Sequence, residues 1–123
     1  MARPADGASL AGTASGSVDL VQAHKVFPGT PLLVTLRYFR EMARVASERG
    51  SIAFDAVTEP CMDERIIEQW MTKEAAYGYY PSMVPRQLVI DFFERRGFAC
   101  KTAFIVPMEP GATECFGFVR RSS

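Results

Sequence analysis

The chain has 123 residues, of which 48% are hydrophobic and 23% are charged, a composition typical of one folded domain. Its 14 basic and 14 acidic residues give a formal net charge of zero, so no strong field favours nucleic acid or anionic lipid as a partner. The three cysteines form no CxxC pair, which argues against the usual zinc and redox motifs and against a full disulfide framework.

Residues 1–17 are almost all small or polar, chiefly Ala, Gly, Ser, Thr, Pro and Asp. Such a segment buries too little surface to offset the entropy lost on ordering. We therefore expect residues 1–17 to be a flexible low-complexity tail and residues 18–123 to be the folded part. No apolar run has the length of a signal-peptide core or a membrane span, so we expect a cytoplasmic protein that binds no membrane.

The first predicted strand and helix follow this tail. Residues 18–21 form a short apolar run, typical of a buried strand. After a loop, Thr30 is typical of a helix N-cap and Pro31 of a first helical position. The helix is expected to end at Gly50, in a left-handed conformation. Its predicted core-facing stripe contains Leu32, Leu36, Phe39, Ala43 and Ala46.

The middle of the chain predicts one more strand and two more helices. Residues 51–57 should form a strand parallel to the first. A helix is expected over about residues 63–76. Its predicted apolar face contains Ile66, Ile67, Trp70 and Met71. Another helix should open at Pro85 and close at Gly97.

The end of the chain predicts a β-hairpin. Residues 98–106 and 113–120 are two β-rich runs, joined by a short segment that contains proline and glycine. The complete order predicts an α/β fold with a sheet of four strands, two parallel and then a terminal antiparallel hairpin, and about three helices. Cys100 and Cys115 are interpreted as small core residues of the hairpin.

Four stretches carry a resemblance to a known family. They are VDLVQAHKVF, PLLVTLRYFREMARVASERG, SIAFDAVTE and YYPSMVPRQLVIDFFERRGF. In this order and spacing, over roughly residues 18–120, they resemble the C-terminal half of class I S-adenosylmethionine-dependent methyltransferases that act on small molecules. The resemblance implies a partial Rossmann-like sheet, in which the final strand is inserted antiparallel beside the fifth.

The family's main cofactor-binding elements have no counterpart in this sequence. Those elements are a first strand, a glycine-rich loop and an acidic residue that ends the second strand. Gly7, Gly12 and Gly16 follow no predicted strand and precede no helix, so we interpret them as flexible positions.

The resemblance implies a site at the carboxyl ends of the two parallel strands. It places Ala23 and His24 near S-adenosylmethionine. His24 is the only histidine and our first candidate for a base that accepts a proton from the methyl acceptor. The alternative for His24 is a hydrogen bond to the loop backbone. Glu59 either binds a substrate hydroxyl or amine, or caps the coming helix.

Aromatic and cationic residues before the third helix complete the candidate site. Tyr79 and Tyr80, together with Tyr77, are candidates for a lid over the acceptor. Trp70 is better explained by core packing. Arg86 is a candidate for binding an anionic group on the acceptor, and the alternative is an ordinary exposed arginine. No metal site is predicted.

Three functional hypotheses fit these features. The first is methyl transfer from S-adenosylmethionine to a small molecule, with the cofactor half supplied by another chain or by a self-complementing oligomer. The second is a non-catalytic remnant or dimeric binding module of the same fold, and the third is a piece of a longer protein. The strand from Val18 to Val21 would lack an inner neighbour, and its unpaired edge would invite a homodimer or a complementing chain.

Overall fold

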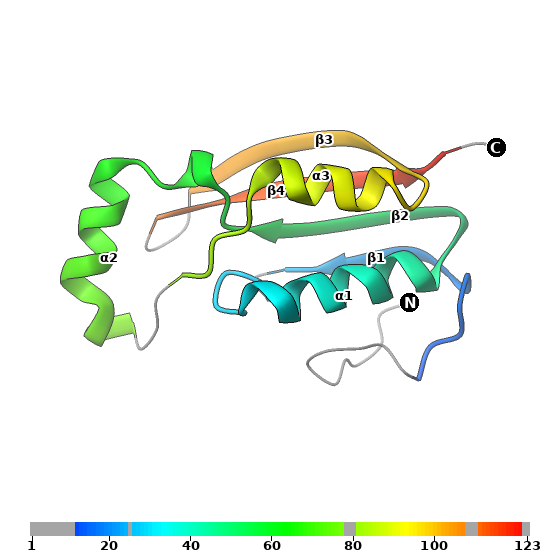
Figure 1. Ribbon diagram of the computed structural model, residues 1–123, viewed down its shortest axis with the longest axis horizontal. Coiled ribbons are helices and arrows are strands. Elements are labelled where there is room, and N and C mark those ends of the chain that lie inside the picture. The colour runs from blue at the N-terminus through cyan, green and yellow to red at the C-terminus, as the bar shows by residue number, and fades with distance from the viewer. Residues whose placement is uncertain (1–11, 25, 78–80, 108–110, 122–123) are drawn as a thin grey trace.

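The computed structural model describes residues 12–24, 26–77, 81–107 and 111–121, without the side chains of residues 73–77. This part of the chain forms a four-stranded sheet with two helices packed on one face (Figure 1). A third helix lies beyond one end of the sheet. None of the described helices is long and apolar enough to cross a membrane.

The sheet has the strand order β1-β2-β4-β3. Strand β1 (Val18–Ala23) pairs in parallel with β2 (Ala46–Ala56). Strand β4 (Ala112–Arg120) is inserted antiparallel between β2 and β3 (Phe98–Pro107). These pairings confirm the predicted α/β sheet, with two parallel strands and a terminal antiparallel hairpin.

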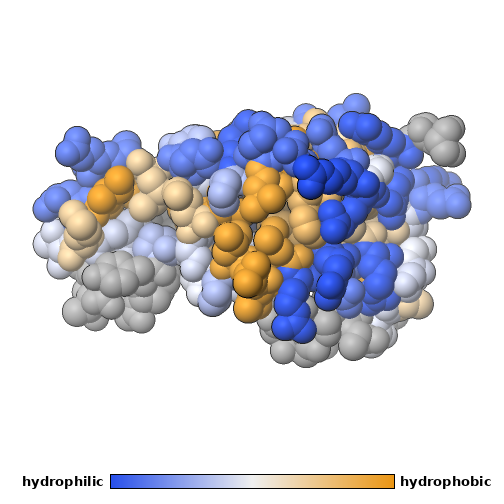
Figure 2. Space-filling model, in the orientation of Figure 1, coloured by the Kyte–Doolittle hydropathy of each residue, from blue (hydrophilic) through white to orange (hydrophobic). Residues whose placement is uncertain are grey.

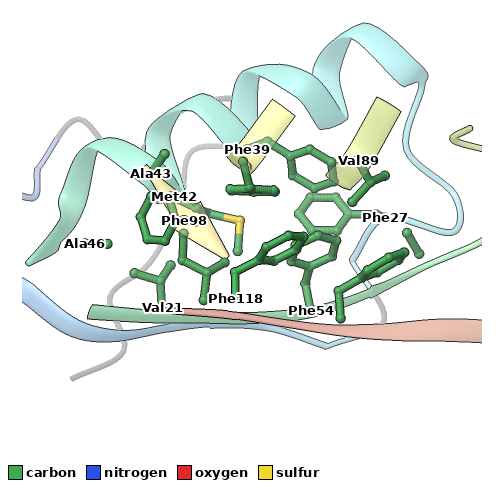
Figure 3. Packing of buried hydrophobic residues seen from close by; sticks show 14 of the residues in the cluster. Val21, Phe27, Phe39, Met42, Ala43, Ala46, Phe54, Val89, Phe98 and Phe118 are labelled. Atoms are coloured by element: carbon green, nitrogen blue, oxygen red, sulfur yellow. The ribbon is translucent and has the colours of Figure 1, made fainter. Parts of the chain in front are cut away.

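The core lies between the sheet and two helices, α1 (Leu32–Val45) and α3 (Arg86–Glu94) (Figure 3). Alternate residues of β2, such as Ile52 and Phe54, point toward the helices and are buried. Six fully buried phenylalanines dominate the packing: Phe27, Phe39, Phe93, Phe98, Phe116 and Phe118. The residues of the predicted stripe that lie within α1 thus face the core.

Helix α1 is shorter than predicted at its C-terminal end. It ends at Val45, and Ala46 is already extended and opens β2, so the predicted helix end at Gly50 is wrong. Gly50 is needed for a different reason, since an added Cβ would lie 2.9 Å from backbone atoms of Ser47. The guanidinium of Arg120 donates hydrogen bonds to the Ala43 and Ala46 carbonyls at the C-terminal end of the helix, which favours termination there.

The start of α1 also differs by one residue. Pro31 is the extended N-cap residue, and Thr30 belongs to the preceding turn. The Thr30 hydroxyl donates a hydrogen bond of 2.7 Å to the Val26 carbonyl instead of capping the helix. Pro31 has no N–H, and its carbonyl accepts the N–H of Thr35 at 3.0 Å, so the helix begins without a side-chain cap.

The prediction of a buried first strand is wrong. Within residues 18–21 only Val21 is buried, and Leu20 is 50% exposed. Strand β1 is an edge strand with the helices on one face only, so alternate residues point away from the core. This arrangement confirms that β1 is an edge of the sheet in the described structure.

Helix α2 (Glu64–Tyr77) begins where the sequence predicted, because the Asp63 carboxylate accepts the Ile66 N–H at 2.8 Å. Its buried face is narrower than predicted. Ile66 and Trp70 are buried, which supports the packing interpretation of Trp70, whereas Ile67 and Met71 are exposed. Helix α2 lies beyond the end of the sheet, so fewer neighbours cover its apolar side chains (Figure 1).

The limits of α3 agree with the prediction to within one residue. Pro85 is the N-cap residue of α3, and Gly97 follows the helix with a φ of +90°. Gly111 has a φ of +86° immediately before β4. An added Cβ at Gly111 would also lie 3.2 Å from both Ile66 and Trp70, so this glycine permits the close approach of α2.

Residues 12–17 contact the end of α1. The Gly16 N–H donates to the Arg44 carbonyl at 2.9 Å. The Arg44 guanidinium in turn donates to the Thr13 carbonyl and the Ser15 hydroxyl, both at 3.0 Å. Residues 1–11 of the expected tail lie outside the described residues.

Candidate active site

The parallel pairing of β1 and β2 brings two polar segments to one edge of the sheet. Ala23 is paired with Phe54, so His24 follows β1 beside Asp55 of β2. The Nδ1 atom of His24 lies 3.8 Å from the Oδ1 atom of Asp55. This distance exceeds that of a direct hydrogen bond but gives an ion pair when the imidazole is protonated.

The two side chains differ in exposure. The imidazole of His24 is 71% exposed, whereas the carboxylate of Asp55 is 3% exposed. An accessible histidine beside a buried carboxylate is an arrangement suited to proton transfer at the surface of a site. Asp55 was not predicted as a site residue, although a carboxylate inside the apolar run SIAFDAV was a usable signal.

A buried polar network follows the end of β2. Ala56 is paired with Glu114, whose carboxylate is almost completely buried. The Thr58 hydroxyl donates a hydrogen bond of 2.6 Å to Oε1 of Glu114 and also lies 3.5 Å from the Cys61 sulfur. The Nε of Arg86 donates to Oε2 of Glu114 at 2.8 Å.

The network fixes the position of Arg86. Because Glu114 accepts its Nε–H and also attracts it through charge, the pKa of Arg86 is raised above its ordinary value. Its side chain remains 39% exposed, so part of the guanidinium faces solvent. Arg86 is thus held by an ion pair while it remains partly exposed, and its binding of an anionic group stays a prediction.

Glu59 caps a helix, but not the one expected. Its Oε1 atom accepts the backbone N–H of Arg86 at 2.8 Å, at the start of α3. The helix that follows Glu59 directly is capped by Asp63 instead. Hydrogen bonds from the backbone N–H groups of Arg86 and of Glu59 itself lower the pKa of Glu59, and the positive charge of Arg86 adds to this effect.

Replacing Glu59 with alanine is expected to lower the free energy of unfolding at neutral pH by up to about 1 kcal/mol. The folded state lowers the pKa of this carboxylate, so its contribution is present above the ordinary value of 4.5 and is lost as the pH falls through the lower folded-state pKa. Urea unfolding of both proteins between neutral and acidic pH measures the difference.

The matched control is Glu68→Ala, which removes an exposed carboxylate from α2. We expect this variant to change the stability little at any of these pH values. A difference between Glu59→Ala and the wild type that grows on acidification would contradict the assignment of Glu59 as a charged cap.

Three exposed apolar side chains come from the segments that precede and begin α1 and that precede α3. Val26, Leu33 and Met83 are exposed by 40%, 74% and 47%, respectively. Two backbone hydrogen bonds, from Ser82 N–H to the Pro28 carbonyl and from Val84 N–H to the Val57 carbonyl, hold the segment before α3 against the loop between β1 and α1 and against the end of β2. Figure 2 shows hydrophobic surface gathered over the start of α1 and the neighbouring segment.

The remaining predicted site residues are the tyrosines of the lid and Ala23. Tyr79 and Tyr80 lie outside the described residues, as does the side chain of Tyr77, so the lid stays a prediction. Ala23 is the last residue of β1 and is half-buried at the edge of the candidate site. Among the side chains that the structure describes, no group of three or more His, Cys, Asp or Glu residues could hold a metal ion.

The described glycines before β1 do not provide a close backbone cradle for S-adenosylmethionine. Gly12 and Gly16 precede β1, and an added Cβ at either would meet no atom within 4 Å. These glycines therefore do not form the close backbone cradle for which a glycine is needed. The binding of S-adenosylmethionine by Ala23 and His24 stays a prediction.

No protein-family profile and no curated protein sequence matches this chain. Solved structures do resemble it. Magnesium protoporphyrin IX methyltransferase from Synechocystis PCC 6803, with bound SAH, gives a TM-score of 0.67 at 12% identity, over 85% of this chain and 46% of that one. A SAM-dependent methyltransferase from Methanosarcina mazei gives a TM-score of 0.72 at 8% identity, over 97% of this chain and 66% of that one.

A putative sarcosine dimethylglycine methyltransferase from Galdieria sulphuraria gives a TM-score of 0.58 at 13% identity, over 88% of this chain and 55% of that one. The fold is that of class I methyltransferases. At these identities the likeness shows the fold alone. The chain spans about half the length of the Synechocystis and Galdieria proteins.

The methyltransferase-like fold indicates where a ligand would bind relative to the polar residues after β1 and β2. In open α/β sheets, ligands bind at the carboxyl ends of parallel strands. His24, Asp55, Thr58 and Glu59 lie at that end of β1 and β2. Thr58 and Glu114 were missed by sequence reasoning, because only the β2–β4 register brings the two side chains together.

Proposed function

We propose that this chain is the acceptor-side half of an S-adenosylmethionine-dependent methyltransferase that methylates a small molecule. The cofactor-holding half would come from another polypeptide or from a longer form of this chain. The observation that carries the proposal is the sheet order, with β4 inserted antiparallel between β2 and β3 and β1 left as an open edge.

The work of this chain in that reaction is to place the acceptor and take its proton. S-adenosylmethionine, when bound, supplies the methyl group, and the transfer depends mainly on correct placement of the reactants. His24 accepts the proton of an acceptor hydroxyl or amine, and Asp55 supports the resulting imidazolium from 3.8 Å. Ala23 and His24, at the end of β1, would line one side of the bound cofactor.

The surroundings favour an acceptor with an apolar body and a polar reacting group. Val26, Leu33 and Met83 supply exposed apolar contacts beside the strand ends. The exposed part of Arg86 and the second carboxylate oxygen of Glu59 would provide polar contacts to the acceptor. The magnesium protoporphyrin IX and sarcosine dimethylglycine methyltransferases are named for small-molecule acceptors, which supports this substrate class.

The outer edge of β1 would receive the missing part of the sheet. Residues 18–21 have a neighbouring strand on one side only in the described structure. A strand from a complementing chain, or from a second copy, would pair with the remaining backbone groups.

The alternative is a non-catalytic remnant or dimeric binding module of the same fold. The lack of a glycine cradle among the described residues favours it for the isolated chain. The coding sequence upstream of Met1 separates the two functions. We expect it to encode a strand followed by a G-x-G-x-G segment, or a neighbouring gene to do so.

Calorimetric titration of S-adenosylmethionine into the chain joined to that segment tests whether the two parts form a cofactor site. The chain together with that segment should bind S-adenosylmethionine saturably, and His24→Ala should reduce turnover of an accepted substrate by roughly a hundredfold or more. If neither the upstream sequence nor a neighbouring gene encodes such a segment, the binding-module alternative is favoured and the proposed activity fails.

A further inference from the structure

Three exposed arginines lie toward the ends of α1 and α3 that are farther from the candidate active site. We call them the arginine cluster and define it by Arg40 of α1 and by Arg95 and Arg96, which directly follow α3. The two helices run side by side in the same direction, and both begin beside the candidate active site (Figure 1). Figure 2 shows strongly hydrophilic surface over the later parts of both helices.

Contacts between aromatic rings bring Arg96 near Arg40. The guanidinium of Arg96 lies over the Phe92 ring, 3.6 Å from its centre, and its Nη1 atom donates a hydrogen bond of 2.9 Å to the Phe92 carbonyl. The Phe92 ring in turn contacts that of Phe39, at 5.9 Å between centroids, and Arg40 is the next residue of α1. Partial desolvation lowers the pKa of Arg96, and the positive charges of Arg40 and Arg95 lower it further.

No carboxylate among the described residues forms an ion pair with the arginine cluster. The carboxylates on the same stretches of the two helices have other partners: Glu41 with Arg44 at 2.9 Å, Asp91 with Gln87 at 2.9 Å and Glu94 with Arg121 at 3.8 Å. The three guanidinium groups therefore repel one another in the folded protein. Arg37, another exposed arginine without an ion pair in the described structure, precedes Arg40 by one turn of α1 and adds to the positive charge.

Helix stability explains only part of the arginine cluster. Cations at the C-terminal end of a helix are stabilising, which accounts for Arg95 and Arg96 after α3. Arg40 lies inside α1, before its last turn, and its charge acts on Arg96 as a repulsion. Like charges on neighbouring side chains reduce stability, so Arg40 has a cost to the fold that binding of an anion would remove.

The chemistry of the arginine cluster suits a phosphate group. Guanidinium groups bind phosphate oxygens with paired hydrogen bonds, and a phosphate monoester carries nearly two negative charges at neutral pH. Arg96 is already held by the Phe92 ring and carbonyl, so little conformational entropy is lost when it binds a ligand. In the described structure its Nε–H and Nη2–H groups make no hydrogen bond, which leaves these donors available for a ligand.

The surrounding charges favour a single phosphate group over a polyanion. Glu41, Asp91 and Glu94 flank the arginine cluster, and the formal net charge of the whole chain is zero. A nucleic-acid backbone or an anionic membrane would meet these carboxylates as well as the arginines. A small ligand can contact the arginines alone.

We propose that Arg40, Arg95 and Arg96 form a binding site for one phosphate group of a small ligand, separate from the candidate active site. This inference does not rest on the proposed methyl transfer. The arginines are exposed, so each contact with the ligand is partly screened by solvent. We therefore expect a dissociation constant of about 0.1–1 mM.

NMR titration of the ¹⁵N-labelled chain with inorganic phosphate and with phenyl phosphate tests the proposal. At constant ionic strength, the signals of the Arg96 Nε–H and the Gly97 N–H should shift saturably. Arg40→Gln and Arg96→Gln should each weaken binding about tenfold. The matched control is Arg65→Gln, at an exposed arginine of α2, which should leave the affinity unchanged. Tighter binding of phenyl phosphate than of inorganic phosphate would support a phosphorylated organic ligand, and equal binding would support the free ion.

Urea unfolding provides a second measurement. Without phosphate, Arg40→Gln should be at least as stable as the wild type, because it removes a repulsion. About 10 mM inorganic phosphate should raise the urea midpoint of the wild type more than that of Arg40→Gln.

Four results would overturn the proposal. The first is the lack of a saturable shift with either probe up to about 10 mM, well above the expected dissociation constant. The second is an unchanged affinity in both Arg40→Gln and Arg96→Gln. The third is an equal effect of phosphate on the urea midpoints of the wild type and Arg40→Gln. The fourth is saturation of the same signals by single-stranded DNA or anionic vesicles but by neither phosphate probe, which would assign the arginine cluster to a polyanion.

Discussion

Replacing Phe54 with alanine is expected to lower the free energy of unfolding by about 3–5 kcal/mol, the range for removing a phenylalanine from a packed core. Phe54 stands at the centre of the core and is 4% exposed. Its ring centroid lies 4.6–6.0 Å from those of five other phenylalanines: Phe27, Phe39, Phe93, Phe116 and Phe118. Urea unfolding measures the loss.

Phe104→Ala is the matched control, because it makes the same change on the opposite face of the same sheet. Phe104 is 53% exposed, so its loss should cost less than about 1 kcal/mol. Equal losses for the two variants would contradict the one-sided core.

Replacing Arg120 with alanine is expected to lower the free energy of unfolding by about 2–4 kcal/mol. Its guanidinium donates hydrogen bonds to four carbonyls, which lie in α1, at the start of β2 and after α3: Ala43 at 3.3 Å, Ala46 at 2.9 Å, Ser47 at 3.4 Å and Arg96 at 3.0 Å. It also lies 4.1 Å from the centre of the Phe98 ring. The variant removes all these contacts and leaves the C-terminal carbonyls of α1 without their cation.

Arg121→Ala tests whether this effect belongs to position 120. Arg121 is exposed and has a long ion pair of 3.8 Å with Glu94, so its loss should cost less than about 0.5 kcal/mol. A similar loss for both arginine variants would mean that Arg120 has no special role at this corner. Chemical unfolding under identical buffer conditions gives the comparison.

The fold was largely predictable because local signals agreed with the tertiary structure. Pro85 and Gly97 marked the limits of α3 correctly, and the proline- and glycine-containing turn marked the hairpin. The end of α1 was not predictable from Gly50. Arg120, which is 75 residues from Val45 along the chain, hydrogen-bonds the carbonyls at this helix end, and no local pattern reports such a contact.

The candidate site was predictable in position but not in its contacts. The ends of the two parallel strands correctly located His24 and Glu59 at one edge of the sheet. The partners of these residues depend on pairings between strands and on the packing of α3. The helix capped by Glu59 begins at Arg86, 27 residues later, so the nearby helix was the wrong choice.

The central claim is that this chain provides one half of a methyltransferase-like site and does not hold the cofactor alone. Isothermal titration of S-adenosylmethionine into the purified chain tests it most directly. We expect no heat beyond that of dilution, because the described residues provide no glycine cradle. Saturable binding with one cofactor per chain and a micromolar dissociation constant would contradict the claim.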